Sequence, residues 1–219
     1  MVAENLISTA VLPLRTSDTG KLALASMENF NIRHLPIVNN RQLLGVISEE
    51  DILVHNTNEP IGSYGLSLIH SFVKKTDHIY EVMRLLAEHQ LTIIPVVDSE
   101  GDYIGMVSLE DVLNYFAKTA AFSESGSIVV LEFQHRGYSL AEIARLVEAE
   151  GATILSTFVT SHPEDSIVEV TLKINHQDIR NIIHAFNRFG YEIKASFNEE
   201  EYLESLQGRF DALMSYLNV

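Results

Sequence analysis

The sequence of 219 residues contains no cysteine. Disulfides, thiolate metal sites and cysteine nucleophiles are therefore excluded together. Basic residues are also scarce, because 15 Lys and Arg stand against 30 Asp and Glu and give a formal net charge of −15 at pH 7. The acidic excess is spread over both halves of the chain. We therefore expect the protein to bind neither nucleic acid nor anionic membranes. One small anionic ligand in a local pocket is compatible with this charge.

Long hydrophobic runs are missing as well. The longest stretch without a charged side chain, residues 60–73, has 14 residues, whereas a membrane-spanning helix needs about 20. Residues 1–5 contain no basic group and lead into no long apolar core, so no signal peptide is expected. Hydrophobic residues still make up 46% of the chain, enough for a sizeable core. We expect a soluble, cytoplasmic protein with one large domain or two small ones.

The first half of the sequence contains an internal repeat. Residues 33–38 resemble residues 92–97, both with an apolar-Pro-apolar pattern, and residues 45–51 resemble residues 105–111. An amphipathic helical pattern precedes each copy, with Asp18 and Asp77 as the expected N-caps. Each copy is predicted to be a β-α-β-β-α unit. Since neither unit could bury its apolar face alone, the two should pack together.

The strongest local signal is a Gly-x-x-Ser-x-x-Asp segment that closes each copy of the repeat. Ser-x-x-Asp resembles a capping box, which would make both residues purely structural. Alternatively, the glycine lets a ligand approach the backbone, and the serine and the helix N-terminus face a phosphate or ribose oxygen. The aspartate would then accept the two hydroxyls of a ribose. Two copies, each behind an apolar strand, favour the ligand-binding interpretation.

These two units resemble a tandem pair of CBS domains, over roughly residues 5–118. The resemblance implies an adenosine nucleotide as the regulatory ligand and no required cofactor. It also implies two sets of nucleotide-binding residues. The motif residues are Ser48, Asp51, Ser108 and Asp111. Basic side chains for a phosphate are Arg33 and His34, whose counterparts in the second unit are Thr92 and Ile93. We therefore expect asymmetric sites, with a charged ligand held better by the first.

The second half is predicted to have the element order βαββαβ of a ferredoxin-like sandwich, with Gly151 and Gly190 ending its two helices. Residues 127–197 resemble an ACT domain, a regulatory module that commonly pairs in dimers and binds amino acids. The family's usual Asp-Arg-Pro-Gly run is replaced by other residues, His135, Arg136, Gly137 and Tyr138. Tyr138 brings a Cβ and a ring to the place of close approach, so we expect a structural or pairing role.

A terminal helix is predicted over residues 198–219. Its apolar positions have heptad-like spacing and are Leu203, Leu206, Phe210, Leu213 and Leu217. This helix either docks on its own domain or packs against a partner chain. The predicted α+β architecture thus consists of CBS unit 1 (residues 1–58), CBS unit 2 (59–120), a linker near 119–127, the ACT-like domain (127–197) and the terminal helix. This order resembles that of acetoin-utilisation accessory proteins.

No spacing typical of a metal site, a catalytic triad or a Walker loop is present, so we expect a regulator and no enzyme. The first hypothesis is a homodimeric sensor that binds AMP, ATP or S-adenosylmethionine in the CBS pair and transmits binding through dimer geometry. The second is a ligand-free dimerisation or interaction module, in which the two motifs are only helix caps. Amino-acid sensing by the ACT-like domain is a third possibility.

Overall fold

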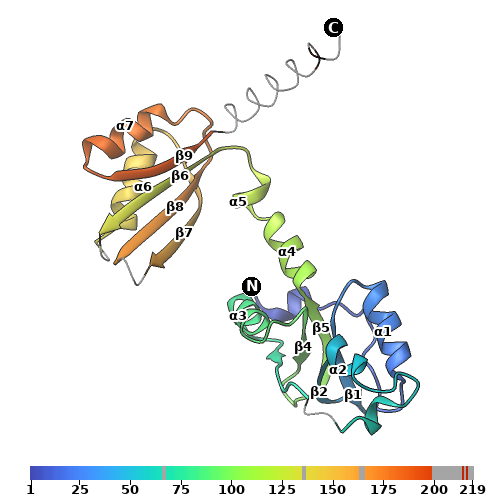
Figure 1. Ribbon diagram of the computed structural model, residues 1–219. Helices are drawn as coiled ribbons and strands as arrows, with labels where there is room; N and C mark the ends of the chain where they lie inside the picture. The colour runs from blue at the N-terminus through green and yellow to red at the C-terminus, as the bar shows by residue number, and fades with distance from the viewer. Residues whose placement is uncertain (66–67, 135–136, 163–165, 199–213, 215, 217–219) are drawn as a thin grey trace. The chain divides into compact units, whose positions relative to one another are not determined.

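A computed structural model of the chain describes residues 1–65, 68–134, 137–162, 166–198, 214 and 216. The chain divides into two compact units, Met1–Tyr115 and a second that starts at Phe116. Each unit contains both helices and strands (Figure 1). Within the described ranges, no helix has both the length and the apolar character that a bilayer crossing requires.

The first repeat forms a β-hairpin flanked by two helices. It comprises a short 3-10 helix (Ala3–Leu6), α1 (Gly20–Asn29), β1 (His34–Asn39), β2 (Gln42–Ser48) and α2 (Glu49–Leu53). The strands are antiparallel, with His34 opposite Ser48 and a register shift after Ile37. In place of the predicted first strand, the structure has an isolated parallel bridge between Leu14 and Ile37.

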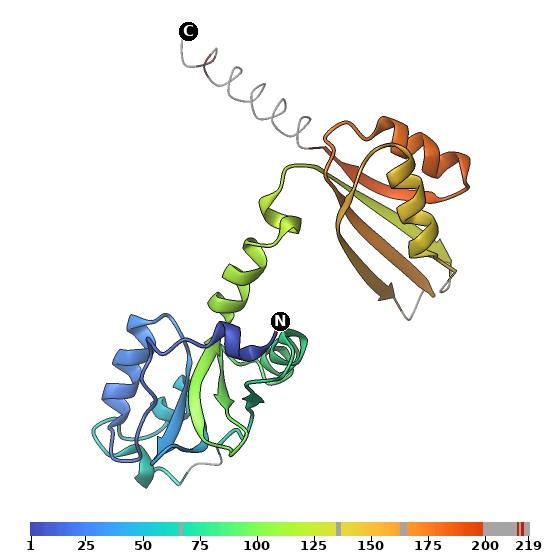
Figure 2. The same cartoon turned by 180° about the vertical axis from the view of Figure 1, so that it is seen from behind.

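The second repeat follows the same plan after a connecting 3-10 turn (Ile61–Ser63). It comprises β3 (Val73–Lys74), α3 (Ile79–Glu88), β4 (Ile93–Val97), β5 (Tyr103–Ser108) and α4 (Leu109–Ala117). Its sheet has the order β3-β4-β5, with Ile93 opposite Ser108 and a register shift after Val96. Figure 2 shows the same two repeats from behind. The equal registers place the two Ser-x-x-Asp segments at equivalent points.

The predicted N-caps of α1 and α3 are wrong by one residue. Thr19 and His78 occupy the N-cap positions and accept hydrogen bonds from the backbone of Leu22 and Tyr80. Asp18 and Asp77 instead accept a hydrogen bond from the backbone N–H three residues earlier, on Arg15 at 2.7 Å and on Lys74 at 2.8 Å. A short carboxylate stabilises a turn in this way as readily as it caps a helix.

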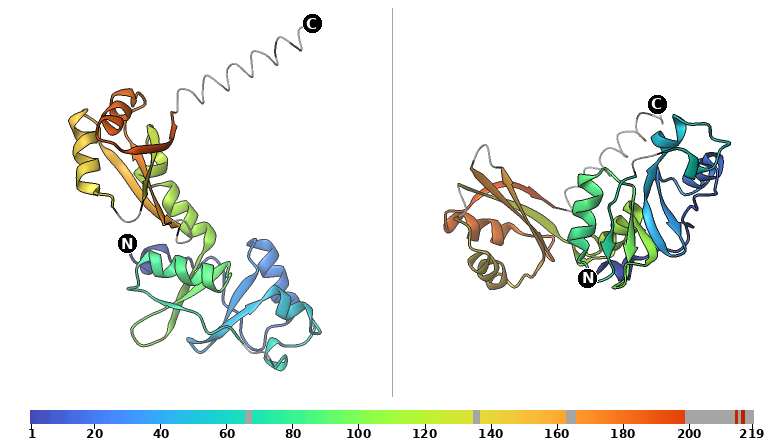
Figure 3. Two further views of the ribbon diagram at one scale, coloured as in Figure 1. Left: turned by 60° about the vertical axis from the view of Figure 1, so that its left-hand side comes forward. Right: turned by 90° about the horizontal axis from the view of Figure 1, so that it is seen from below.

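The second unit has the order strand, helix, strand, strand, helix, strand after a single-turn helix, α5 (Ala120–Ser123), which lies within the predicted linker. Its elements are β6 (Ser127–Gln134), α6 (Leu140–Ala149), β7 (Ile154–His162), β8 (Ile167–Ile174), α7 (Arg180–Arg188) and β9 (Glu192–Phe197). The four strands are antiparallel and lie in the order β7-β8-β6-β9. Figure 3 shows α6 and α7 on one face of this sheet.

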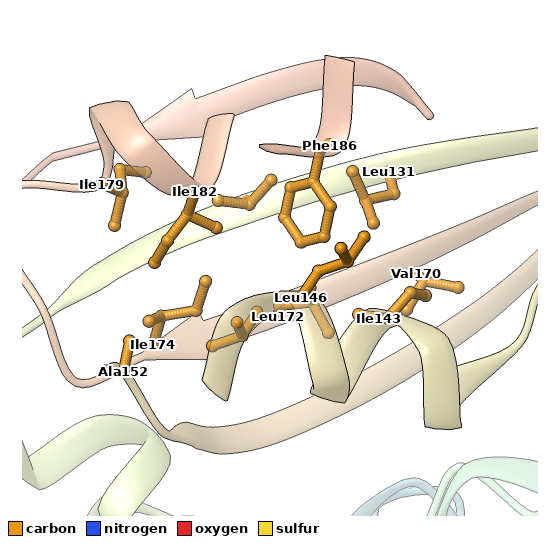
Figure 4. Close-up of a cluster of buried hydrophobic side chains, with 12 residues drawn as sticks. Leu131, Ile143, Leu146, Ala152, Val170, Leu172, Ile174, Ile179, Ile182 and Phe186 are labelled. Carbon is orange, nitrogen blue, oxygen red and sulfur yellow. The ribbon is translucent and has the colours of Figure 1, made fainter. Parts of the chain in front are cut away.

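The core of the second unit lies between this sheet and its two helices (Figure 4). Every second residue of β8 from Val168 to Ile174 is buried, whereas the residues between them are only partly covered. From the helices, Ile143 and Phe186 are fully buried. Such alternation is typical of a sheet with one covered face. The predicted helix ends hold, since Gly151 and Gly190 have φ of +77° and +78° directly after the C-caps.

Several residues singled out in the sequence lie outside the described ranges. These are His135 and Arg136 of the ACT-like motif, and the apolar series Leu203, Leu206, Phe210, Leu213 and Leu217 of the predicted terminal helix.

Candidate functional site

The first Ser-x-x-Asp segment forms a complete capping box at the start of α2. Ser48 Oγ accepts the backbone N–H of Asp51 at 3.0 Å, and Asp51 Oδ2 accepts the backbone N–H of Ser48 at 3.0 Å. The serine hydroxyl also donates to Asp51 Oδ2 at 2.7 Å. Two of the three bonds use the same carboxylate oxygen, Oδ2. The other oxygen, Oδ1, has no hydrogen-bond partner among the described residues, so it is available to a ligand.

The second segment repeats this geometry at the start of α4. Ser108 N–H and Oγ–H donate to Asp111 Oδ2 at 2.9 and 2.6 Å, and Asp111 N–H donates to Ser108 Oγ at 3.0 Å. The capping interpretation of the motif is therefore correct for both copies. It does not compete with ligand binding, because half of each aspartate remains free.

Each capping box lies on the wall of a pocket. The Asp51 pocket has a volume of about 330 Å³ and is lined by Arg33, His34, Ser48, Glu49, Glu50, Asp51, Ile69, His89 and Gln90. The Asp111 pocket has a volume of about 350 Å³ and is lined by Ser8, Ala10, Val11, Phe30, Asn31, Ile32, Thr92, Ile93, Met106, Ser108, Leu109, Glu110 and Asp111. The structure thus brings the six predicted site residues into two pockets, four of them into the first.

Both pockets are built from the two repeats together. The Asp51 pocket receives Ile69 because the backbone of this residue pairs with Val46 of β2, at 3.0 and 3.3 Å. In the Asp111 pocket, Ser8 pairs in the same way with Met106 of β5, at 2.8 and 3.3 Å. In each case the segment that leads into one repeat closes the pocket of the other.

Arg33 and His34 differ in how they meet the Asp51 pocket. The Arg33 side chain is exposed and makes no ion pair with any described residue. His34 is buried, with 8% of its surface exposed, and its Nδ1 lies 3.1 Å from Thr92 Oγ1 and accepts the Thr92 backbone N–H at 3.2 Å. An accepting Nδ1 has no proton, so the geometry assigns the proton of the neutral ring to Nε2.

The electrostatics of the pocket agree with a neutral His34. Burial lowers the pKa of the imidazole from its ordinary value of 6.5, and the nearby Arg33 charge acts in the same direction. Asp51 and Glu50 oppose this shift without reversing it. His34 therefore offers an Nε2–H donor, and the positive charge on the wall comes from Arg33.

Sequence reasoning missed the pocket residues that follow α1 and α3. Phe30 and His89 are the C-caps of these helices, and Asn31 and Gln90 follow them with φ of +52° each. This left-handed conformation is uncommon for residues other than glycine and turns the chain from the helix toward the pocket. These positions are equivalent in the two repeats, because each pair is separated by 59 residues. A residue-by-residue alignment of the two copies would therefore have identified them.

The ACT-like motif is described only from Gly137 onward. Tyr138 is half-buried and packs against the core of the second unit, with its ring centroid 5.8 Å from that of Phe133. A group of three or more His, Cys, Asp or Glu residues placed to hold a metal ion does not occur among the described residues.

The match to a family profile lies in the first half of the chain. The sequence profile of the family described as CBS domain matches residues 3–56 and 69–118. A homoserine O-acetyltransferase of Methanococcus vannielii is 31% identical over 121 residues, which cover 52% of this chain and 24% of that enzyme. A magnesium transporter, MgtE, of Thermus thermophilus is 31% identical over 94 residues, covering 42% of this chain and 21% of the transporter. This chain thus spans less than a quarter of the length of either protein.

Among solved structures, a CBS domain pair/ACT domain protein of Thermotoga maritima is 26% identical, with a TM-score of 0.48, and the match covers 54% of this chain and 98% of that one. The profile match coincides with the two β-hairpin units, and their Ser-x-x-Asp segments lie at equivalent points. The first half of the chain is therefore a tandem pair of CBS domains.

Proposed function

We propose that the CBS pair binds an adenosine-containing nucleotide, such as AMP, ATP or S-adenosylmethionine, as a regulatory ligand. CBS domain pairs typically bind adenosine ligands as regulatory sensors. The observation that carries the proposal here is the half-free aspartate on the wall of each pocket, whose Oδ2 is engaged in a capping box and whose Oδ1 is available. A carboxylate oxygen accepts hydrogen bonds only, which suits ribose hydroxyls.

The Asp51 pocket is the principal site for a phosphorylated ligand. Arg33 is a permanent cation with five donors, and it makes no ion pair with a described residue that would compete with a phosphate. His34 adds a donor at Nε2, because its Nδ1 is held by Thr92. In this proposal Asp51 receives the ribose, Arg33 and His34 face the phosphate, and Ser48 fixes the orientation of the aspartate.

Binding at this site would regulate a partner and would not catalyse a reaction. We propose a homodimer in the cytoplasm, in which the ligand alters how the two copies pair. The second unit supports an ACT-like pairing domain, because its strand order β7-β8-β6-β9, with both helices on one face, is that of a ferredoxin-like sandwich. Light scattering of the full chain at tens of micromolar should give the mass of a dimer, and a monomer would contradict this part of the proposal.

The nucleotide site is tested by calorimetric titration of the full chain with AMP, ATP and S-adenosylmethionine. We expect wild-type protein to bind at least one of them and Asp51→Ala to lower the affinity for AMP at least about tenfold, because a ligand hydroxyl loses a charged acceptor. Thr19→Ala is the matched control, since it removes an N-cap in the same unit but lies on neither pocket wall.

Two outcomes would contradict the proposal. Equal affinity of wild type and Asp51→Ala for AMP would show that the site is wrongly assigned. No binding of any of these compounds would favour the alternative of a ligand-free interaction module, in which the capping boxes have only a structural role. A thermal shift assay checks the same point, since a ligand at 100 times its Kd adds about 2.7 kcal/mol to the free energy of unfolding.

A further inference from the structure

The two pockets differ at the positions that the repeat makes equivalent. Arg33 of the Asp51 pocket corresponds to Thr92 of the Asp111 pocket, and His34 corresponds to Ile93. His89 corresponds to Phe30, each of them the C-cap of a helix. At all three positions the side chain in the Asp51 pocket contains nitrogen, whereas the equivalent side chain in the Asp111 pocket does not.

The residues that line the two pockets have the same net charge. The Asp51 pocket carries one acidic residue more than its counterpart, since Glu49 corresponds to Leu109, but Arg33 offsets it. The difference lies in the groups that can touch an anion. None of the residues that line the Asp111 pocket is Lys, Arg or His, whereas Glu110 and Asp111 both stand on its wall. A phosphate there would meet two carboxylates and no cation, which is unfavourable in a partly desolvated site.

The Asp111 pocket nevertheless keeps the features that suit a nucleoside. Its aspartate has the same free Oδ1 and the same capping bonds as Asp51. The wall offers apolar surface in Phe30 and Ile93, together with the Asn31 side-chain amide. Apolar walls with a few polar groups are typical of small-molecule sites, and an amide can pair with the edge of an adenine base.

We infer that the Asp111 pocket takes an adenosine derivative whose 5′ substituent has no phosphate, while phosphorylated adenosine binds in the Asp51 pocket. This assignment rests on the proposed nucleotide-binding function and makes the two sites selective for different charge classes. Arg33 and His89 on one wall, against Thr92 and Phe30 on the other, are the residues that determine the selectivity. The occupant of the Asp111 pocket is a neutral nucleoside or one with a positively charged substituent.

The test uses calorimetric titrations of the full chain with AMP and with adenosine, and S-adenosylmethionine as a cationic probe. In Asp51→Ala, the Asp111 pocket is the intact site, and we expect it to bind adenosine or S-adenosylmethionine at least about tenfold more tightly than AMP. In Asp111→Ala, AMP should bind with the wild-type affinity and a stoichiometry of one per chain.

A gain of function makes the test sharper. Phe30 is 43% exposed and has a wall position, so Phe30→Arg in the Asp51→Ala background places a cation in the Asp111 pocket. We expect AMP affinity to rise at least about tenfold over Asp51→Ala alone, and Phe30→Gln to give no such rise because it adds a polar group without charge. If neither variant differs from the parent, Phe30 does not determine the selectivity.

The titrations distinguish an error in the selectivity of the two pockets from an error in the nucleotide-binding function. If Asp111→Ala lowers the AMP stoichiometry from two to one, both pockets bind phosphate and the selectivity is refuted while the nucleotide function stands. If adenosine, AMP and S-adenosylmethionine bind only where Asp51 is intact, the Asp111 pocket is not a nucleoside site and the inference falls. If no compound binds to wild-type protein, the proposed function fails together with this inference.

Discussion

The two CBS repeats have the same backbone plan and different pocket walls. Gly45 and Gly105 have φ of +151° and +152°, and Asn31 and Gln90 have φ of +52° each. The capping boxes of Ser48 and Ser108 agree to within 0.1 Å in every bond. The repeats diverge where side chains face a pocket, as at Arg33 and Thr92. The glycines and the capping boxes are thus retained in both copies, whereas side chains that line the two pockets differ.

The largest effect is expected at the two glycines that let the repeats approach each other. A Cβ on Gly45 would lie 2.6 Å from Leu68 Cβ, and a Cβ on Gly105 would lie 2.4 Å from Ile7 Cγ2. Because a Cβ moves only with its backbone whereas Cγ2 moves by rotation of χ1, we expect Gly45→Ala to cost about 3 kcal/mol and Gly105→Ala about 2 kcal/mol. Urea unfolding followed by circular dichroism measures both free energies.

Gly101→Ala is the control for the glycine pair. Gly101 also has a positive φ, +90°, but a Cβ there would have no neighbour within 4 Å. Its substitution reports the backbone cost alone, about 1 kcal/mol. A loss for Gly45→Ala no larger than the loss for Gly101→Ala would show that the segment at Leu68 shifts freely and does not fix the pocket.

Substitution of either capping serine is expected to lower the free energy of unfolding by a smaller amount, and by the same amount in both repeats. Ser48→Ala and Ser108→Ala each remove an acceptor for the aspartate N–H and a donor to the aspartate Oδ2, so both should lower the free energy of unfolding by about 1 kcal/mol. Thr19→Ala, which removes a single cap bond of 3.3 Å, should cost less. A difference above about 1 kcal/mol between the two serines would break the equivalence of the repeats.

Much of the fold could be predicted because its signals are local in the sequence, and in the first half they occur twice. The apolar-Pro-apolar strands, the Gly-x-x-Ser-x-x-Asp turns and the helix-ending Gly151 and Gly190 each act through local backbone chemistry, which a sequence displays directly. The predicted first strand of repeat 1 is wrong, because the structure has an isolated bridge between Leu14 and Ile37 in its place. The predicted N-caps Asp18 and Asp77 are wrong, because an aspartate that precedes a helix can stabilise a turn instead.

The candidate site was harder to predict because it joins residues distant in the chain. The motif residues were found from their spacing, but the contact of His34 with Thr92 spans 58 residues and changes what His34 can do. The resemblance to CBS domains implies that His34 is a basic side chain for a phosphate. Burial against the other repeat makes the ring neutral and leaves the charge to Arg33. Tertiary environment, which spacing does not encode, decides protonation.

The smallest effect concerns this histidine, which has an isoleucine, Ile93, as its counterpart. Burial and Arg33 lower the pKa of His34 in the folded protein from its ordinary value of 6.5, against the opposing effect of Asp51 and Glu50. As the pH falls through 6.5, the unfolded chain takes up a proton on this residue before the folded protein does. The contribution of His34 to the free energy of unfolding must therefore decrease as the pH falls below 6.5. Above pH 6.5 this contribution is fully retained.

His34→Asn separates this contribution from those of the other eight histidines. The Asn Oδ1 atom replaces Nδ1 as the acceptor for the Thr92 N–H but does not titrate, so the variant should lose less stability than wild type between pH 7.5 and pH 5.5 in urea unfolding. Equal losses would mean that His34 is protonated to the same extent in both states. In that case burial would not keep His34 neutral below pH 6.5, and in that range the two pockets would differ in charge at both Arg33 and His34.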